Sequence, residues 1–318
     1  MYSSYCKELA SRQRCDALIL QGDSWGERLE KDSASVFNSL AKRYRLGLIS
    51  GGTGSFSPSN MAAQINYFAD QGIRPGIIIS YIDQSDLGDE VCRYQNYTTV
   101  KYGKADDSSL GSHRLPTVTV RPYVNSGEMV FEYTPIVRLF RSPFSSTRVI
   151  AEVIYRIQRK FKKTFLGETY SEKCTWKDIS RELKEPSRAS IAYFEQMLVA
   201  YIDSIFIRYP DMRLYLVTHP HLGNLDGSYR VDVGDIVASQ IKKSQFKERI
   251  IHLNFSNMMS KYEIEPGSIS QIYEKNDLAS HLTDDSYKLM ARIIVDSVDR
   301  DISSQRAPMM SNYKALQQ

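Results

Sequence analysis

Short apolar runs alternate with longer amphipathic stretches along most of this chain. The runs contain four or five residues and end at glycine or polar residues, a pattern that predicts buried strands. The predicted strands cover residues 17–20, 46–49, 77–81, 214–217 and 250–253. The predicted helices, with apolar residues at helical spacing, cover residues 33–44, 58–71, 191–208 and 284–298. Alternation of strand and helix predicts a parallel sheet with helices on its faces.

The middle of the chain departs from this alternation. Two predicted strands, at residues 117–124 and 128–133, are joined by Asn125-Ser126-Gly127, which is typical of a hairpin. Residues 147–163 then follow as an amphipathic helix. The predicted organisation is a core of residues 16–92 and 188–300, an inserted cap-like region of residues 93–187, and a polar, mobile tail of residues 301–318.

Composition and charge narrow the class of protein. The 318 residues are 42% hydrophobic and 25% charged, which is typical of a soluble globular chain. The net charge of +4 is small and dispersed, so we expect no nucleic-acid partner. No apolar run is long enough to predict a membrane span, and the first residues lack the apolar segment of a signal peptide. We expect a cytoplasmic location, with the periplasm or cell envelope as the alternative if a leader has been removed.

The cysteines give no sign of a metal site. Cys6, Cys15, Cys92 and Cys174 share no C-x-x-C spacing and form no zinc motif. They are compatible with a reducing compartment, although the sequence also permits a disulfide between Cys6 and Cys15. We predict no metal and no organic cofactor, and the oligomeric state is left open.

The segment Gly22-Asp23-Ser24-Trp25-Gly26 directly follows the first predicted strand. Open α/β sheets bind ligands at the carboxyl ends of their strands, so Ser24 is a candidate nucleophile. As G-x-S-x-G the segment matches the nucleophile elbow of α/β-hydrolases, but that elbow needs several strands before it. As Gly-Asp-Ser it resembles block I of the SGNH/GDSL hydrolases, whose nucleophile follows the first strand. The structural alternative for Ser24 is a helix cap.

A glycine loop, Ser50-Gly51-Gly52-Thr53-Gly54, follows the second predicted strand. It resembles block II of the same family, which implies that the backbone N–H of Gly52, with Gly54 second, binds the oxyanion beside that of Ser24. A flexible turn and a phosphate-binding loop are the alternatives. No lysine stands in Walker-A position, which disfavours phosphate.

The two remaining blocks of the family are degraded. In the third, Asp86 takes the place of the aspartate but Ser85 replaces the asparagine that donates to the oxyanion; the Gln84 amide is a substitute donor. In the fifth, His281 precedes the last predicted helix as the family's base does. Leu278 stands where the aspartate is expected, and Asp277 lies one residue further away. Either a widened turn brings Asp277 to His281, or a backbone carbonyl orients the imidazole.

Other polar and aromatic residues are expected at the substrate. His219 and His221 follow the fourth predicted strand, and we assign them to a pocket wall. His-x-His also binds metals, although no further ligand completes a site in the sequence. Asp23 and Trp25 flank the nucleophile, and Gly54, Gln84 and Asp86 are the other expected substrate contacts.

The resemblance, which covers about residues 16–86 and 214–298, implies a fold and an activity. The expected fold is a flavodoxin-like three-layer α/β/α sandwich with a central parallel sheet of about five strands. The expected function is a serine esterase that removes O-acyl, in particular O-acetyl, groups from a carbohydrate by a Ser-His(-Asp) mechanism. Two alternatives remain: a polysaccharide O-acetyltransferase, and an inactive SGNH-fold glycan-binding module.

Overall fold

The computed structural model describes residues 15–96, 98–104, 114–120, 174, 176–258, 269–275, 277 and 280–315. Within these residues, five strands form one parallel sheet in the order β2-β1-β3-β6-β7. The strands are β1 (Cys15–Gly22), β2 (Gly47–Gly52), β3 (Ile73–Tyr81), β6 (Arg213–Thr218) and β7 (Ile250–Asn254). This is the strand order of flavodoxin-like folds, and it confirms the predicted fold class.

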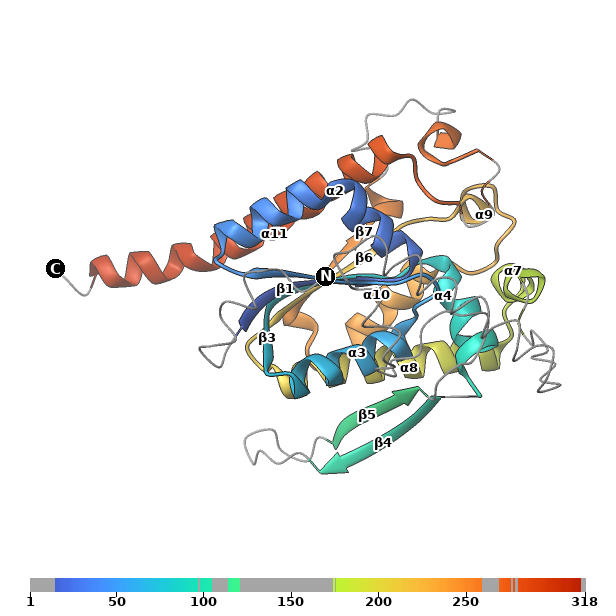
Figure 1. The fold of residues 1–318 in the computed structure, drawn as a ribbon, viewed down its shortest axis with the longest axis horizontal. Helices are drawn as coiled ribbons and strands as arrows, with labels where there is room; N and C mark the ends of the chain where they lie inside the picture. The colour runs from blue at the N-terminus through green and yellow to red at the C-terminus, as the bar shows by residue number, and fades with distance from the viewer. Residues whose placement is uncertain are drawn as a thin grey trace, which may run out of the picture.

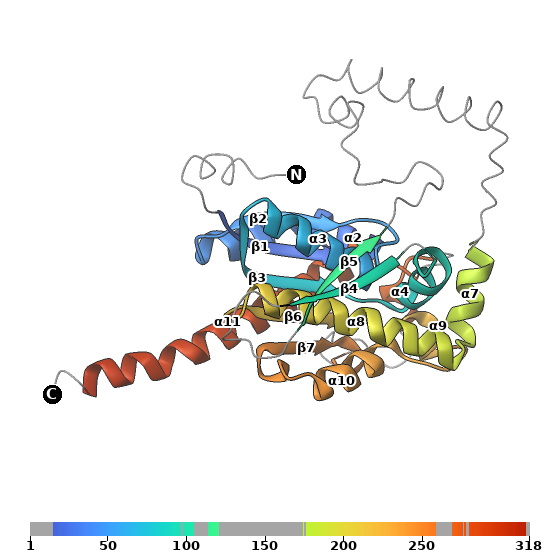
Figure 2. The ribbon, with the colours of Figure 1, turned by 90° about the horizontal axis from the view of Figure 1, so that it is seen from below.

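Helices cover both faces of the sheet (Figures 1 and 2). One face packs against α2 (Ser24–Arg43) and α11 (Asp284–Ala315). The other packs against α3 (Pro58–Asp70), α8 (Arg188–Arg208) and α10 (Val233–Lys243). Shorter segments complete the described part of the chain: α4 (Gln84–Asp89), η2 (Glu90–Tyr94), α7 (Trp176–Lys184), α9 (Leu222–Leu225), η4 (Lys247–Arg249), η5 (Phe255–Asn257) and η7 (Ile269–Ile272).

Strand β1 lies in the middle of the two hydrophobic layers. Ala17 and Ile19 pack toward α3 and α8, whereas Leu18 and Leu20 pack toward α2 and α11. Successive side chains of a strand point to opposite faces, so a strand buried on both sides is apolar at every position. This is why the uninterrupted run at residues 17–20 predicts a central strand of a parallel sheet.

Helix α2 begins earlier than predicted. We expected a helix from residue 33, but the helix starts at Ser24 itself. The carboxylate of Asp23 accepts a hydrogen bond from the backbone N–H of Trp25 (2.8 Å) and caps the helix. Ser33, inside α2, has non-helical backbone angles, which marks a kink where the prediction placed the start.

The described part of the predicted hairpin is a single strand, which pairs with a segment that we did not predict. Strand β5 (Arg114–Val120) overlaps the predicted strand at residues 117–124, but it pairs antiparallel with β4 (Thr98–Lys104), which precedes it. We did not predict β4, because its mixed polar sequence lacks a continuous apolar run. The predicted partner at residues 128–133 and the predicted helix at 147–163 lie outside the described residues.

A disulfide ties the start of the predicted insertion to its end. Cys92 in η2 bonds to Cys174, two residues before α7, with 5.5 Å between the Cα atoms. Helix α7 packs against α4, and Ile179 and Leu183 are buried beside the disulfide. The pairing considered in the sequence, Cys6–Cys15, lies partly outside the described residues.

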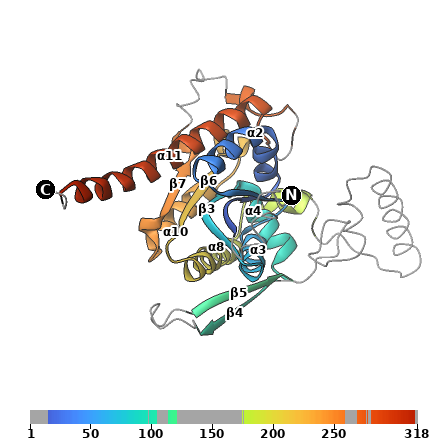
Figure 3. The ribbon, with the colours of Figure 1, turned by 60° about the vertical axis from the view of Figure 1, so that its left-hand side comes forward.

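The last helix is longer than predicted. Helix α11 continues to Ala315, so residues 301–315 of the expected mobile tail are helical, and its last turns extend away from the sheet (Figure 3). Side chains on this extension bond to the core: Tyr215 Oη donates to Asp301 (2.8 Å) and Tyr44 Oη to Asp299 (2.8 Å). We ended the predicted helix at residue 298 because the apolar spacing stops there. In the structure, polar contacts hold the helix beyond that point.

One described helix, α8, is long and apolar enough to cross a membrane, contrary to our expectation that no such run exists. Of its most apolar window, 61% is buried inside the protein. Phe194, Leu198 and Phe206 of α8 belong to the core beneath the sheet. The hydrophobicity of α8 is therefore that of a core helix.

Candidate active site

The carboxyl ends of β1, β2, β3 and β6 lie at one edge of the sheet and carry the predicted site residues except Asp277 and His281, which precede α11. The turn from β1 into α2 depends on Gly22, whose φ of 152° favours glycine. A Cβ there would lie 3.0 Å from Cβ of Tyr81 and 3.1 Å from Cα of Gly26. The chain therefore passes directly from the strand into the helix, with Ser24 as its first residue.

Ser24, His281 and Asp277 form a connected chain of hydrogen bonds. The Oγ of Ser24 lies 2.8 Å from Nε2 of His281, and Nδ1 of His281 lies 2.5 Å from Oδ2 of Asp277. An ionised carboxylate only accepts, so the proton of the neutral imidazole sits on Nδ1. Nε2 is then free to accept the hydroxyl proton of Ser24, which is the arrangement that activates a serine nucleophile.

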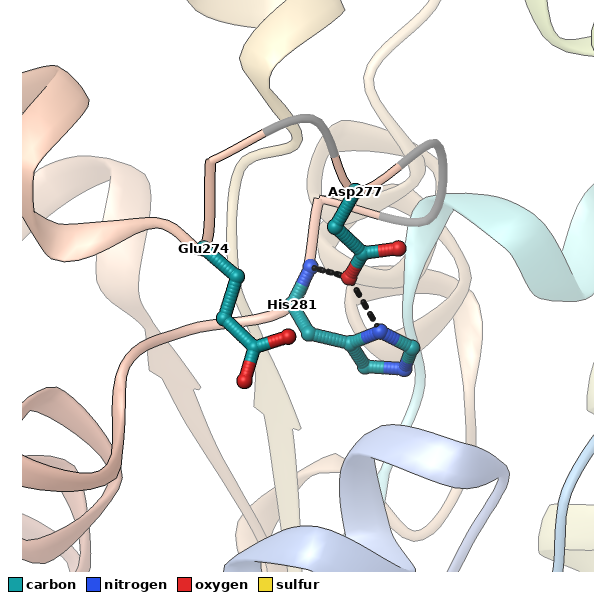
Figure 4. A group of neighbouring side chains, drawn as sticks. All are labelled: Glu274, Asp277 and His281. Atoms are coloured by element: carbon teal, nitrogen blue, oxygen red, sulfur yellow. Dashed lines mark hydrogen bonds and ion pairs between the residues drawn. The ribbon is translucent and has the colours of Figure 1, made fainter.

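Asp277 reaches His281 despite the additional residue between them. Its Oδ2 also accepts from the backbone N–H of His281 (2.9 Å), so one oxygen holds both the backbone and the ring, as Figure 4 shows. The backbone N–H of Ser280 donates to the carbonyl of Asp277 (3.1 Å) and closes the turn. This is the widened turn that we expected if Asp277, one residue further from His281 than in the family, was to bond to the imidazole.

The glycine loop lies against the first turn of α2. A Cβ at Gly52 would stand 2.6 Å from the backbone nitrogen of Glu27 and 2.8 Å from the carbonyl carbon of Gly26, so only glycine fits. A Cβ at Gly54 would meet no atom within 4 Å. Of the two predicted positions, Gly52 is packed beside the nucleophile's helix and Gly54 faces open space.

Ser85 and Gln84 use their donors within the protein. The Oγ of Ser85 donates to Asp83 (2.7 Å) and to Asp23 (3.2 Å), and its backbone N–H is also bonded to Asp83. The amide of Gln84 donates to the carbonyl of Val231 (3.0 Å). Both side chains are buried. We therefore leave Ser85 and Gln84 out of the proposed oxyanion site.

A cluster of buried carboxyl groups lies behind the nucleophile. Burial, followed by the nearby charge of Asp83, raises the pKa of Asp23 to about 8. Burial raises the pKa of Asp83 to about 7, and burial with the charges of Asp23 and Asp83 raises the pKa of Asp86 well above its usual value. Oδ2 of Asp23 lies 3.4 Å from Oγ of Ser24. Protons held in this cluster keep negative charge low beside the nucleophile near neutral pH.

The two histidines after β6 are almost fully buried. His219 is 4% exposed and packs between the rings of Trp25 (5.4 Å) and Phe255 (5.7 Å). Burial lowers its pKa to about 4. His221 is equally buried and caps α9, accepting from the backbone N–H of Gly223. The histidines therefore support the site from behind.

The other expected substrate contacts are also buried. Trp25 is 1% exposed and packs on Tyr81 and His281, and Asp86 closes a capping box with Asp83 at the start of α4. We expected these residues at the substrate because they are polar or aromatic and follow a strand, but residue type does not show that their side chains point into the protein. Among the expected substrate contacts, Gly54 alone faces open space in the described part of the chain.

Two groups of described side chains place possible metal ligands within 4.8 Å of one another: Glu274, Asp277 and His281, and Asp23, Asp83 and Asp86. In the first group, Asp277 is bonded to His281, and Glu274 forms an ion pair with Arg28 (2.6 Å). In the second, the carboxyl groups accept bonds from serine and backbone donors. Interactions within the protein account for the first group. In the second, Oδ2 of Asp83 and Oδ1 of Asp86 are buried without a hydrogen-bond partner among the described residues. The absence of a metal stays a prediction.

Two residues of the site were not predicted from the sequence. Asp83 was not singled out, although Asp83-x-x-Asp86 directly after a strand is the spacing of a capping box. Ser280 was not singled out either. Nothing in its residue type signals the positive φ of 52° that it adopts beside His281.

Comparison with protein-family models gives no match, and comparison with the sequences of curated proteins gives none. Among solved structures, the chain is similar to an acetyl xylan esterase, Est2A, from the rumen bacterium Butyrivibrio proteoclasticus. The TM-score is 0.40 and the sequence identity 9%. The match covers 91% of this chain and 64% of that protein, so the chain spans less than two thirds of its length. The fold assignment rests on the strand order given above.

Proposed function

We propose that this protein is a serine hydrolase that cleaves ester bonds. The observation that supports the proposal most is the hydrogen-bond chain from Ser24 through His281 to Asp277. A weak nucleophile, a base within reach and a carboxylate that orients the base are the parts that acyl transfer through a serine requires. All three come from segments that meet at the carboxyl edge of the sheet.

Each of the three side chains has one role in the proposed reaction. His281 removes the proton from Oγ of Ser24 as the oxygen attacks the acyl carbon, and it returns a proton to the departing alcohol. Asp277 holds the ring in the tautomer with Nδ1–H and stabilises the imidazolium that forms. Water, activated by His281 in the same way, then releases the acyl group from Ser24.

The proposed oxyanion donors are backbone N–H groups. Ser24 is the first residue of α2, where helical N–H groups have no partner within the helix and the helix dipole favours negative charge. Gly52 supplies the second donor in this proposal, because its lack of a side chain brings β2 against the same turn of α2. Removing one such donor typically costs about 3 kcal/mol in the activation barrier.

For the substrate we propose an O-acetyl ester of a carbohydrate. This narrower proposal rests on the SGNH/GDSL resemblance and not on an observed aromatic platform for a sugar. Tyr94 is buried and donates to the carbonyl of Ser55 (2.7 Å), and Tyr102 on β4 is 45% exposed. Acetate release from a panel of acetylated oligosaccharides that differ in their sugar, compared with p-nitrophenyl acetate, would show whether turnover depends on the sugar.

The disulfide bears on location. Disulfides persist in oxidising compartments and are rare in the cytosol. The Cys92–Cys174 bond therefore favours the periplasm or cell envelope over the cytoplasm in this proposal.

Hydrolysis of p-nitrophenyl acetate tests the proposed activity. Ser24→Ala should lose nearly all turnover while keeping the circular dichroism spectrum of the parent. Ser39→Ala, an exposed position on the same helix, serves as the matched control and should hydrolyse the ester as the parent does. Turnover of Ser24→Ala within twofold of the parent would remove Ser24 from the reaction.

A further inference from the structure

The segment that carries His281 is held against the chain that follows β6. Tyr273 and Leu282 form an antiparallel bridge, and we name the described residues between them the base loop: Glu274, Lys275, Asp277, Ser280 and His281. Oη of Tyr273 donates to the carbonyl of Pro220 (2.6 Å). The ring of His219 meets that of Tyr273 edge-on at 5.8 Å. The His-Pro-His segment, residues 219–221, thus forms the surface on which the base loop rests.

Ser280 adopts a backbone conformation that residues with a side chain rarely take. Its φ is 52°, in the left-handed region, and it is 2% exposed. Such a conformation persists only where surrounding contacts impose it, and it is common at functional sites. Here it occurs directly before His281, in the turn that accommodates the additional residue between Asp277 and the imidazole.

A hydrogen bond from Ser280 reaches the His-Pro-His segment. Its Oγ lies 3.1 Å from Nδ1 of His221. The same Nδ1 accepts from the backbone N–H of Gly223, so it carries no proton, and the hydroxyl of Ser280 is the donor. The bond is buried at both ends and joins the base loop to the first residues of α9.

We propose that Ser280, held by His221, is the positioning residue for the base of this enzyme. Its left-handed backbone turns the chain so that Asp277, four residues before His281, bonds both the backbone N–H and Nδ1 of that histidine. The hydrogen bond to His221 keeps the turn in this form. The inference rests on the proposed serine-esterase function and adds two residues that touch neither the substrate nor the reacting atoms.

A second contact of the base loop provides a comparison. Glu274 pairs with Arg28 of α2 (2.6 Å), but the two side chains are 36% and 37% exposed. Water and salt screen an exposed ion pair, so it holds its partners weakly. The buried bond at Ser280 is screened far less. We therefore assign the positioning role to Ser280 and not to the ion pair.

The test measures kcat and KM for p-nitrophenyl acetate in four variants. Ser280→Ala removes the hydroxyl and keeps the side-chain restraint, and His221→Phe removes the acceptor while keeping an aromatic ring beside Tyr229. Each should lower kcat about tenfold with KM within twofold of the parent, since small displacements of a catalytic group are costly. The double variant should lose no more than either single one. Ser286→Ala, a buried serine of α11 bonded to Thr283, is the matched control and should keep the parent's kcat.

A proton NMR measurement separates this inference from the proposed function. The proton shared by His281 and Asp277 should give a low-field signal in the parent that broadens in Ser280→Ala and stays in Ser286→Ala. Ser280→Gly, which has no left-handed penalty, guards against loss of folding and should behave as Ser280→Ala does. Unchanged kcat and an unchanged signal in both Ser280 variants would overturn the inference. An inactive parent whose signal still depends on Ser280 would instead overturn the proposed esterase.

Discussion

At the scale of residues, the carboxylate of Asp277 fixes both the position and the tautomer of the base. One oxygen, Oδ2, accepts from the backbone N–H and from Nδ1 of His281. The bond to the backbone holds the carboxylate in place, so rotation of the imidazole ring would break the bond to Nδ1. The side chain of Asp277 is partly buried, which reduces competition from water. A carboxylate in this position acts through the imidazole and leaves substrate binding unaffected.

We therefore expect Asp277→Asn to lower kcat by about two to four powers of ten, because an amide stabilises the wrong tautomer and carries no charge. KM should change little. Glu274→Gln is the matched control: Glu274 belongs to the same loop but pairs with Arg28, and its kcat should stay within about twofold of the parent's. Steady-state kinetics on both variants decides the matter. If the two variants lost activity equally, the assignment of Asp277 would be wrong.

At the scale of elements, helix α4 brings two carboxyl groups to a third, that of Asp23, beside the nucleophile. Asp83 caps α4, Asp86 closes the capping box, and both face Asp23 at the start of α2. The pKa values of Asp23 and Asp83 rise from the usual 3.8 to about 8 and about 7, chiefly through burial. A carboxyl group with a raised pKa binds more protons in the folded state than in the unfolded state, so its contribution to stability is lost as pH rises toward the folded value.

The consequence is a fall in stability between pH 6.5 and pH 8.5. Burial lowers the pKa of His219 and His252 to about 4. These histidines make the free energy of unfolding rise with pH, but mostly below pH 6.5. Asp83→Asn, which retains a good helix cap, should reduce this fall, and the exposed Asp70→Asn should not. Urea unfolding at pH 6.5 and at pH 8.5 measures the fall in the free energy of unfolding. Stability that rises over this range in the parent, or an equal fall in all three proteins, would show that these carboxyl groups do not hold protons near neutral pH.

The disulfide joins two other elements, η2 and the start of α7. It closes a loop across a sequence separation of 82 residues, and a loop of this length is expected to stabilise the folded state by about 2–5 kcal/mol. Cys92→Ser combined with Cys174→Ser should lower the free energy of unfolding by about this amount. Urea unfolding of this variant and of the parent, without and with reductant, provides the measurement. An unfolding free energy within about 0.5 kcal/mol of the parent's would show that the bond does not form.

At the scale of the whole molecule, the sequence predicts the parallel sheet well and the surroundings of the site poorly. Runs such as Ile77–Tyr81 identify buried strands. The position of Ser24 after the first strand and that of His281 before the last helix identify two residues whose side chains meet. Strand β4 was missed because it packs one side against the core and has no apolar run. The inward orientation of Gln84, Asp86 and His219 was missed because residue type does not show which neighbours supply hydrogen bonds. Long-range contacts decide such orientations.

The central claim is that Ser24 is an activated nucleophile, and covalent labelling tests it most directly. The protein would be treated with a serine-directed fluorophosphonate and its intact mass measured, beside Ser24→Ala and the exposed control Ser39→Ala. We predict one added phosphonyl group in the parent and in Ser39→Ala, and none in Ser24→Ala, because only a serine bonded to a base reacts at an appreciable rate. Equal labelling of the parent and Ser24→Ala, or a parent that stays unlabelled, would contradict the claim.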